Sequence, residues 1–129
     1  MARPKSKGPT EGELAILRVL WDRGASTVRD VHDALKKKND TGYTTTLKQL
    51  QLMAEKGLVE RDESRRSHLY EARLREEKAQ RQIVLRMLDH AFGGSAQKLV
   101  MQALSAKRAT AEELAQVRKL LDELEGGTR

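Results

Sequence analysis

The chain has 129 residues, which fit one domain with an appendage and exclude two large independent domains. Lysine and arginine total 25 against 19 aspartate and glutamate residues, giving a net charge of +6, so an acidic partner is expected. There is no cysteine, which excludes disulfides, thiolate metal sites and cysteine nucleophiles.

The N-terminus is polar and basic and has no features of a secretory signal. No apolar run approaches the ~20 residues of a membrane helix, so we expect a cytoplasmic protein without membrane insertion. Residues 1–9 combine basic residues with proline and glycine and predict a disordered basic arm. The first 75 residues hold 16 Lys and Arg against 11 Asp and Glu, so most of the positive charge lies in the first half.

Two helices are predicted after this arm. The first begins at Thr10, which forms a capping-box pattern with Glu13, and ends at Gly24. The second begins after the Ser-Thr pair 26–27, with Asp30 at the capping-box position, and fades into a lysine run. The expected buried residues are Leu14, Leu17, Leu20 and Trp21 in the first helix and Val28, Val31 and Leu35 in the second.

A third helix is predicted from Tyr43 to Lys56, followed by Gly57, which suits a left-handed C-cap. Its buried face should comprise Thr46, Leu47, Leu50, Met53 and Ala54.

A β-hairpin is predicted next. The runs 58–61 and 68–71 are rich in β-forming residues, and the polar segment between them carries Arg65 and Arg66. Three helices followed by a hairpin is the order of a winged helix-turn-helix, in which the third helix enters the DNA major groove. The fold class is therefore mainly α with a small β-hairpin, with a winged helix over residues 10–74.

Residues 75–129 are predicted to form three amphipathic helices. Gly93 and Gly94 end the first of these helices, and Ser95 can cap the second. Thr110 and Glu113 form a capping box at the start of the third helix. Such short helices make a thin core alone, which favours a helical dimerisation domain over a purely intramolecular core. The expected dimerisation residues are Leu88, Phe92, Leu99, Leu114, Val117, Leu121 and Leu124.

The exposed face of the third helix carries side chains that suit DNA. Thr44, Thr45, Lys48 and Gln49 can donate to phosphates or contact base edges, and Tyr43 can present its hydroxyl to a phosphate. The simpler alternative is a solvated face with a threonine-rich first turn. Consecutive threonines are weak helix formers, so stability alone explains that turn poorly.

Arginines outside the third helix are predicted to touch the DNA backbone. Arg65 and Arg66 at the hairpin tip would lie over flanking backbone, and Arg29 would be a phosphate neighbour. Basic turn residues that only keep the surface soluble are the alternative.

No residues indicate catalysis or a cofactor. His32, His68 and His90 are scattered without a second ligand at metal-binding spacing, so a metal site is not expected. No nucleophile-base arrangement or phosphate-cradling glycine loop is visible, so the chain is predicted not to be an enzyme.

Three segments together resemble the penicillinase repressor family. They are Thr10-Glu-Gly-Glu-Leu-Ala-Ile-Leu17 with Leu20-Trp21, Ser26-Thr-Val-Arg-Asp-Val31, and Gly42-Tyr-Thr-Thr-Thr-Leu47 continuing to Glu55-Lys-Gly-Leu-Val59. The segment Phe92-Gly-Gly-Ser95 and the last helix are also similar, so the resemblance covers nearly the whole chain.

The resemblance implies a homodimeric repressor that binds an inverted-repeat operator in double-stranded DNA through its winged helices. In some members a membrane sensor-protease system triggers cleavage of the repressor in its C-terminal region, which releases a β-lactam resistance operon. An operon of that kind or a stress-response operon is the expected target.

This chain departs from the family pattern in three places. It lacks the cysteine-rich tail of the copper-responsive members. The cleaved bond of the resistance repressors aligns with Gln102 and Ala103, which differ from the Asn-Phe pair cut there. Leu52 stands where members often carry arginine on the exposed face of the recognition helix.

The predicted function is therefore sequence-specific repression, with two alternatives. A winged helix can instead serve as a protein-protein interaction module that never touches nucleic acid, with its C-terminal helices docked on a partner. A nonspecific architectural DNA-binding protein is the other alternative, and it would bind operator-like and random DNA equally well.

Overall fold

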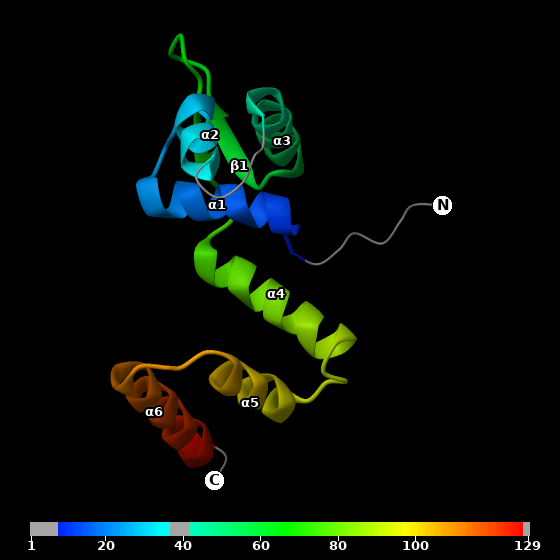
Figure 1. Ribbon diagram of the computed structural model, residues 1–129, viewed down its shortest axis with the longest axis vertical. Helices are drawn as coiled ribbons and strands as arrows, with labels where there is room; N and C mark the ends of the chain where they lie inside the picture. Colours follow the sequence, from blue (N-terminus) through cyan, green and yellow to red (C-terminus); the bar gives the residue numbers. More distant parts are fainter. Residues whose placement is uncertain (1–7, 37–41, 128–129) are drawn as a thin grey trace. The chain divides into compact units, whose positions relative to one another are not determined.

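The computed structural model describes residues 8–36 and 42–127 of the chain. Residues 1–7 of the predicted basic arm and residues 37–38 of the lysine run lie outside the described residues. The chain divides into two compact units, Met1–Arg86 and Met87–Arg129. Figure 1 shows the order of the helices and strands along the chain. The predicted fold class, mainly α with one small hairpin, is confirmed.

Helix α1 spans Glu11–Arg23 and begins with the predicted capping box. The backbone N–H of Glu13 donates to Thr10 Oγ1 at 3.2 Å, and the backbone N–H of Thr10 donates to Glu13 Oε1 at 3.0 Å. The helix ends at Gly24, whose φ of 83° favours glycine.

Helix α2 spans Val28–Lys36 and is capped by Thr27. The backbone N–H of Asp30 donates to Thr27 Oγ1 at 3.1 Å, and Asp30 Oδ2 accepts from the N–H of Thr27 at 3.2 Å. Ser26, the other candidate for this cap, pairs with Tyr70 in an antiparallel bridge through hydrogen bonds of 2.8 and 2.9 Å. Thr27 is therefore the cap, because the backbone of Ser26 is committed to a distant strand.

Helix α3 spans Tyr43–Lys56, as predicted. Gly57 follows in the left-handed conformation, with φ 81° and ψ 14°, and its N–H donates to the carbonyl of Ala54. The N–H of Leu58 donates to the Met53 carbonyl at 2.9 Å. This pattern satisfies carbonyls at the end of the helix and confirms the predicted C-cap.

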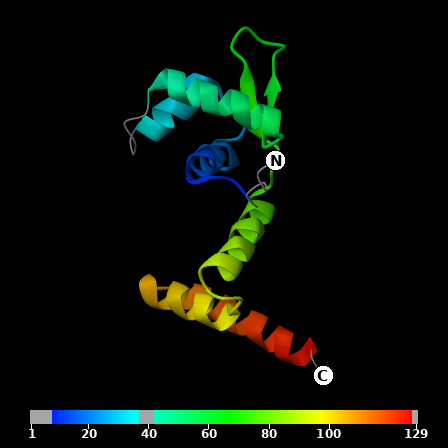
Figure 2. The same cartoon turned by 90° about the vertical axis from the view of Figure 1, so that its right-hand side faces the viewer.

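The hairpin consists of β1, Val59–Asp62, and β2, Leu69–Ala72, paired antiparallel with Arg61 opposite Tyr70. Each strand begins and ends one residue later than the sequence predicts. Leu58 does not begin the first strand, because its N–H closes the end of α3; its carbonyl accepts from the N–H groups of Arg73 and Leu74 just after β2. Figures 1 and 2 show the hairpin loop projecting beyond α2 and α3.

The core of the first unit is formed by α1, α2, α3 and the hairpin. Trp21, half-buried, donates its indole N–H to the carbonyl of Leu74 at 2.9 Å and so joins α1 to the segment after β2. Pro9, which the sequence places in the basic arm, is fully buried. The buried cluster contains Ile16, Leu17, Leu20, Val28, Val31, Leu35, Leu50, Met53, Val59 and Tyr70.

Three helices follow: α4, Glu76–His90; α5, Ala96–Ala106; and α6, Ala111–Gly127. Gly93 and Gly94 take positive φ angles after α4, and Ser95 caps α5 by accepting from the N–H of Lys98 at 3.1 Å. The predicted capping box of Thr110 and Glu113 opens α6, with hydrogen bonds of 2.9 and 3.0 Å.

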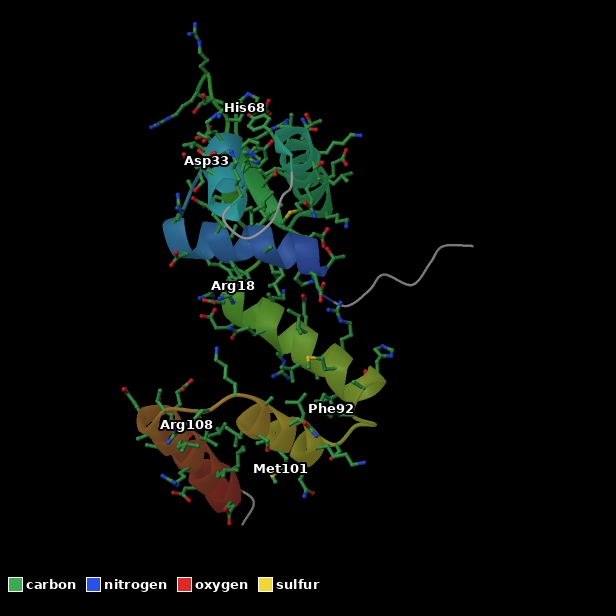
Figure 3. All side chains as sticks on the ribbon, in the orientation of Figure 1. Arg18, Asp33, His68, Phe92, Met101 and Arg108 are labelled. Atoms are coloured by element: carbon green, nitrogen blue, oxygen red, sulfur yellow. The ribbon has the colours of Figure 1, made fainter. Side chains whose placement is uncertain are left out.

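Apolar side chains of the second unit remain in contact with solvent. None of the residues of α5 is buried. Figure 3 labels Phe92, which follows α4, and Met101 on α5. The apolar residues most exposed in this unit are Met87, Val100, Met101, Leu104, Leu120, Leu121 and Leu124. No helix among the described residues is long and apolar enough to cross a membrane.

Candidate nucleic-acid interface

The outward face of α3 begins with polar side chains. Thr44, Thr45 and Lys48 are all exposed on the first turn and a half of the helix. The N-cap residue is Gly42, which offers no side chain to the amides of that turn. These N–H groups can therefore donate to an anion, which the positive end of the helix dipole also attracts.

Gln49 differs from these three residues. Its side chain is half-buried, and its Nε2 atom lies so close to Gly12 of α1 that a Cβ at position 12 would clash with it. The sequence predicts that Gln49, like Lys48, faces the DNA, but in the structure the side-chain amide of Gln49 points toward α1. Leu52 is the apolar member of the outward face, and 53% of it is exposed.

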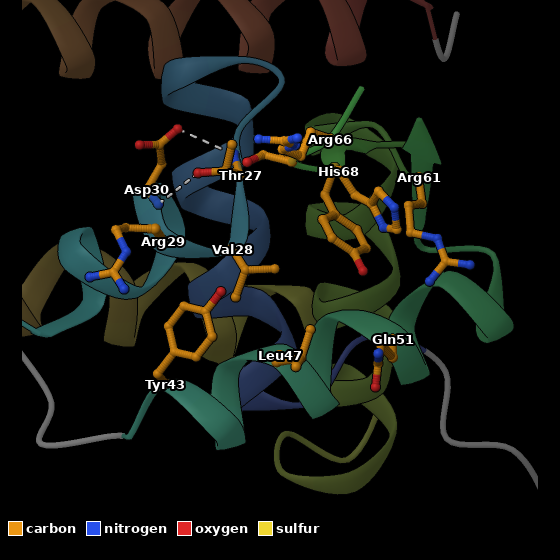
Figure 4. Close-up of a pocket in the computed structure, with 12 residues that line it drawn as sticks. Thr27, Val28, Arg29, Asp30, Tyr43, Leu47, Gln51, Arg61, Arg66 and His68 are labelled. Atoms are coloured by element: carbon orange, nitrogen blue, oxygen red, sulfur yellow. Dashed lines mark hydrogen bonds between the residues drawn. The ribbon is translucent and has the colours of Figure 1, made fainter. Parts of the chain in front are cut away.

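A groove of about 610 Å³ lies between the start of α2, one flank of α3 and the hairpin (Figure 4). Arg29, Arg61 and Arg66 bring three cations to it. Its acidic residue, Asp30, is engaged by Thr27. The other lining residues are Thr27, Val28, Tyr43, Leu47, Gln51, Ser67, His68 and Tyr70. The groove therefore suits an anionic ligand such as a phosphodiester strand.

Arg61 and His68 join this groove although the sequence did not predict them as site residues. Arg61 lies opposite Tyr70 in the hairpin register and forms an ion pair with Glu63 at 3.2 Å. Hydrogen bonding with Tyr70 and the charge of Glu63 raise the pKa of Arg61. Figure 3 labels His68 close to the hairpin loop. The observed hairpin register places Arg61 opposite Tyr70, and the groove forms because α3 lies beside the hairpin, which the sequence does not reveal.

The hairpin tip presents Arg65 and Arg66, both exposed. Asp62 Oδ1 accepts a hydrogen bond from the backbone N–H of Ser64 at 2.9 Å, which shapes the turn that carries them. Hydrogen bonds from Ser64 lower the pKa of Asp62. The turn therefore keeps its carboxylate ionised and turned back toward Ser64.

The first turns of α2 and α3 meet through Arg29 and Tyr43. The guanidinium carbon of Arg29 lies 5.4 Å from the centroid of the Tyr43 ring. On the same ring, His32 packs edge-on, with centroids 5.7 Å apart and an interplanar angle of 79°. The sequence placed Arg29 and Tyr43 in the interface, but it gave no sign that they touch.

The remaining predicted residues lie in the C-terminal helices, except Phe92, which lies between α4 and α5. Leu88, Phe92, Leu99, Leu114 and Val117 are half-buried, whereas Leu121 and Leu124 are exposed. Gln102 and Ala103 are both exposed in the middle of α5. Among the described residues, no group of three histidine, aspartate or glutamate side chains could hold a metal ion.

Three stacked helices, a short strand bridge at Ser26 and a projecting hairpin define a winged-helix protein. The same fold occurs in the DNA-binding domain of the repressor BlaI, with a TM-score of 0.50 and 20% identity over 59% of this chain and 93% of that one. A MarR family protein from Bacillus stearothermophilus also shares it, with a TM-score of 0.50 and 20% identity over 93% of this chain and 75% of that one.

The model of the penicillinase repressor family matches residues 9–123. The transcriptional regulator BlaI of Mycobacterium tuberculosis is 34% identical over 117 residues, which cover 89% of this chain and 83% of that protein. The chain therefore belongs to the penicillinase repressor family and is a winged-helix, DNA-binding transcriptional repressor. This confirms the resemblance and the repressor function predicted from the sequence.

Proposed function

We propose that this repressor acts as a homodimer on an inverted-repeat operator in double-stranded DNA, controlling a β-lactam resistance or stress-response operon. The observation that carries the proposal is the contrast between the two units. The first presents an exposed polar and cationic α3 beside a groove with three arginines. The second exposes apolar side chains that one chain leaves uncovered.

In this proposal α3 enters the major groove. Thr44, Thr45 and Lys48 contact bases and phosphates, and Tyr43 grips the backbone at the start of the helix. Gln49 would have to leave its position beside Gly12 before it could reach a base. Arg65 and Arg66 lie over flanking backbone, and Arg29 binds a phosphate beside the groove.

The homodimer would form through the C-terminal helices. Leu121 and Leu124 are 51% and 58% exposed, one turn apart on α6. Pairing with a second chain would bury such side chains at about 25 cal/mol per Å² of apolar surface. A dimer also presents two recognition helices, which matches the two half-sites of an inverted repeat.

Induction by a sensor-protease system is the finer part of the proposal. The bond between Gln102 and Ala103 is exposed, which gives a protease access. It lies inside helix α5, however, so cleavage requires local opening of that helix first. The chain itself carries out no catalysis in this proposal and works in the cytoplasm, where its DNA is.

Selection of binding sites tests the proposed function. The purified chain is mixed with randomised duplex DNA at moderate salt, and the retained duplexes are sequenced. An enriched inverted repeat is the expected result. No enriched sequence would contradict the proposal and leave either the architectural protein or the protein-protein interaction module.

A further inference from the structure

Tyr43 occupies an unusual position for an exposed residue of a DNA-binding surface. It is the first residue of α3, and 41% of it is exposed. Its ring nevertheless packs against two residues of α2, Arg29 and His32. Arg29 and His32 are three residues apart, so they lie on the same side of α2, and both contact the Tyr43 ring.

The contact with Arg29 is a cation-π interaction. The guanidinium carbon lies 5.4 Å from the ring centroid, within the ~6 Å over which such attraction acts. Neither ion pair found among the described residues involves Arg29. The ring, and not a carboxylate, therefore restrains this cation, so its N–H groups stay available for an incoming phosphate.

The contact with His32 fixes the ring in turn. The edge-on arrangement, at 79°, is one that aromatic rings prefer. The Nδ1 atom of His32 is buried and has no hydrogen-bond partner among the described residues. Burying an unpaired polar atom costs stability, so stability alone does not explain the placement of this histidine.

The position of Arg29 suits a phosphate contact electrostatically. It lies in the first turn of α2, at the positive end of the helix dipole. It lines the groove together with Arg61 and Arg66, and Figure 4 shows Arg29 and Tyr43 on the same side of that groove. A free arginine loses rotamer freedom when it binds, and a restrained one has lost part of it already.

We propose that Tyr43 and His32 are positioning residues that hold the Arg29 guanidinium ready to bind an operator phosphate. The inference rests on the proposed DNA-binding function and deepens it. Tyr43 then acts through Arg29, in addition to any contact its hydroxyl makes. Tyr43 is uncharged, so its own contacts release no counterions when the protein binds DNA. A change in the salt dependence of binding on replacing Tyr43 would therefore report on Arg29.

The test measures binding of the full chain to its selected duplex by fluorescence anisotropy at several salt concentrations. The logarithm of the binding constant falls as the logarithm of the salt concentration rises. Arg29→Ala should make this slope shallower by about 0.9 for each winged helix bound. Tyr43→Ala should make it shallower by a similar amount, and the double variant should make it no shallower still. Tyr43→Phe keeps the ring and should keep the wild-type slope, because the hydroxyl that it loses is uncharged. Gln97→Ala, an exposed position on α5 with no role in the proposed contact, serves as an uncharged control.

A measurement without DNA checks the positioning itself. In the free protein the Arg29 δ-methylene protons should be shifted upfield by the Tyr43 ring, and Tyr43→Leu should abolish that shift. Tyr43→Leu also replaces Tyr43→Ala in the binding test if the alanine variant fails to fold, because it keeps apolar bulk at the start of α3. His32→Leu should reduce the shift by loosening the ring.

The outcomes separate the two proposals. Wild-type protein that binds no duplex refutes the proposed function. Wild-type binding with an unchanged salt slope in the tyrosine variants, or a double variant in which the two losses add, overturns the positioning role alone.

Discussion

Lys48 and Arg66 represent the two parts of the proposed DNA contact, the recognition helix and the hairpin. Both side chains are exposed, and Arg66 also lines the groove beside α3. Replacing both with alanine should weaken operator binding and flatten its salt slope by about 0.9 per lost phosphate contact. Lys119→Ala on α6 is the control, since it removes a cation that has no role in the proposed contact. An unchanged slope in the double variant would refute the contact assignment.

Leu52 offers a gain-of-function experiment at the same face. It lies four residues after Lys48, on the outward side of α3, and is more than half exposed. Leu52→Arg should therefore cost little packing and should raise affinity at low salt, steepening the slope by about one phosphate contact per winged helix. Leu52→Ala should leave the slope as it is. If the arginine variant did so too, position 52 would not face the DNA backbone.

At the scale of helices and strands, Glu13 joins the beginning of α1 to the end of α3. It completes the capping box with Thr10 and accepts a hydrogen bond from Lys56 Nζ at 2.6 Å, although it is buried. Burial raises the pKa of Glu13, but the hydrogen bonds and charge of Lys56 and the hydrogen bonds of Thr10 outweigh it. The pKa therefore lies below its ordinary value, and the carboxylate stabilises the folded state.

Glu13→Ala should consequently lower the free energy of unfolding at neutral pH by about 1–2 kcal/mol. A lowered pKa contributes stability above the unfolded value near 4.5, and that contribution disappears as the pH falls through the folded value. Urea unfolding followed by Trp21 fluorescence at several pH values measures the difference. Glu55→Ala, on the exposed side of α3, is the control. A difference that persisted undiminished at acid pH would contradict this assignment.

The elements that the sequence predicts well are those whose ends are set locally. The capping pairs Thr10 with Glu13 and Thr110 with Glu113, and Gly57 after α3, require only neighbouring residues. The bridge between Ser26 and Tyr70 was missed because the two residues are far apart in the chain. The same limit applies to the site: exposure of Thr44 and Lys48 follows from helical spacing, whereas the contact of Gln49 with α1 and of Tyr43 with Arg29 depends on how helices pack.

At the scale of the whole molecule, the proposed function requires two chains acting together. Leu121→Glu places a charge on the exposed apolar face of α6 and should convert the proposed dimer to monomers, because a paired apolar face would have to bury that carboxylate. Sedimentation velocity measures the change. Gln116→Glu, on the other side of α6, adds the same charge and should leave the dimer intact. Equal masses for wild type and Leu121→Glu would contradict a seam at this position.

Spacing of the two half-sites tests the dimeric repressor most directly. Two winged helices fixed in one dimer must reach half-sites on matching faces of the duplex. Inserting about five base pairs, half a helical turn, between the half-sites of the selected operator should therefore reduce affinity to that of a single half-site. Affinity of the full chain that is indifferent to this insertion would show that the winged helices bind independently, and would contradict the account.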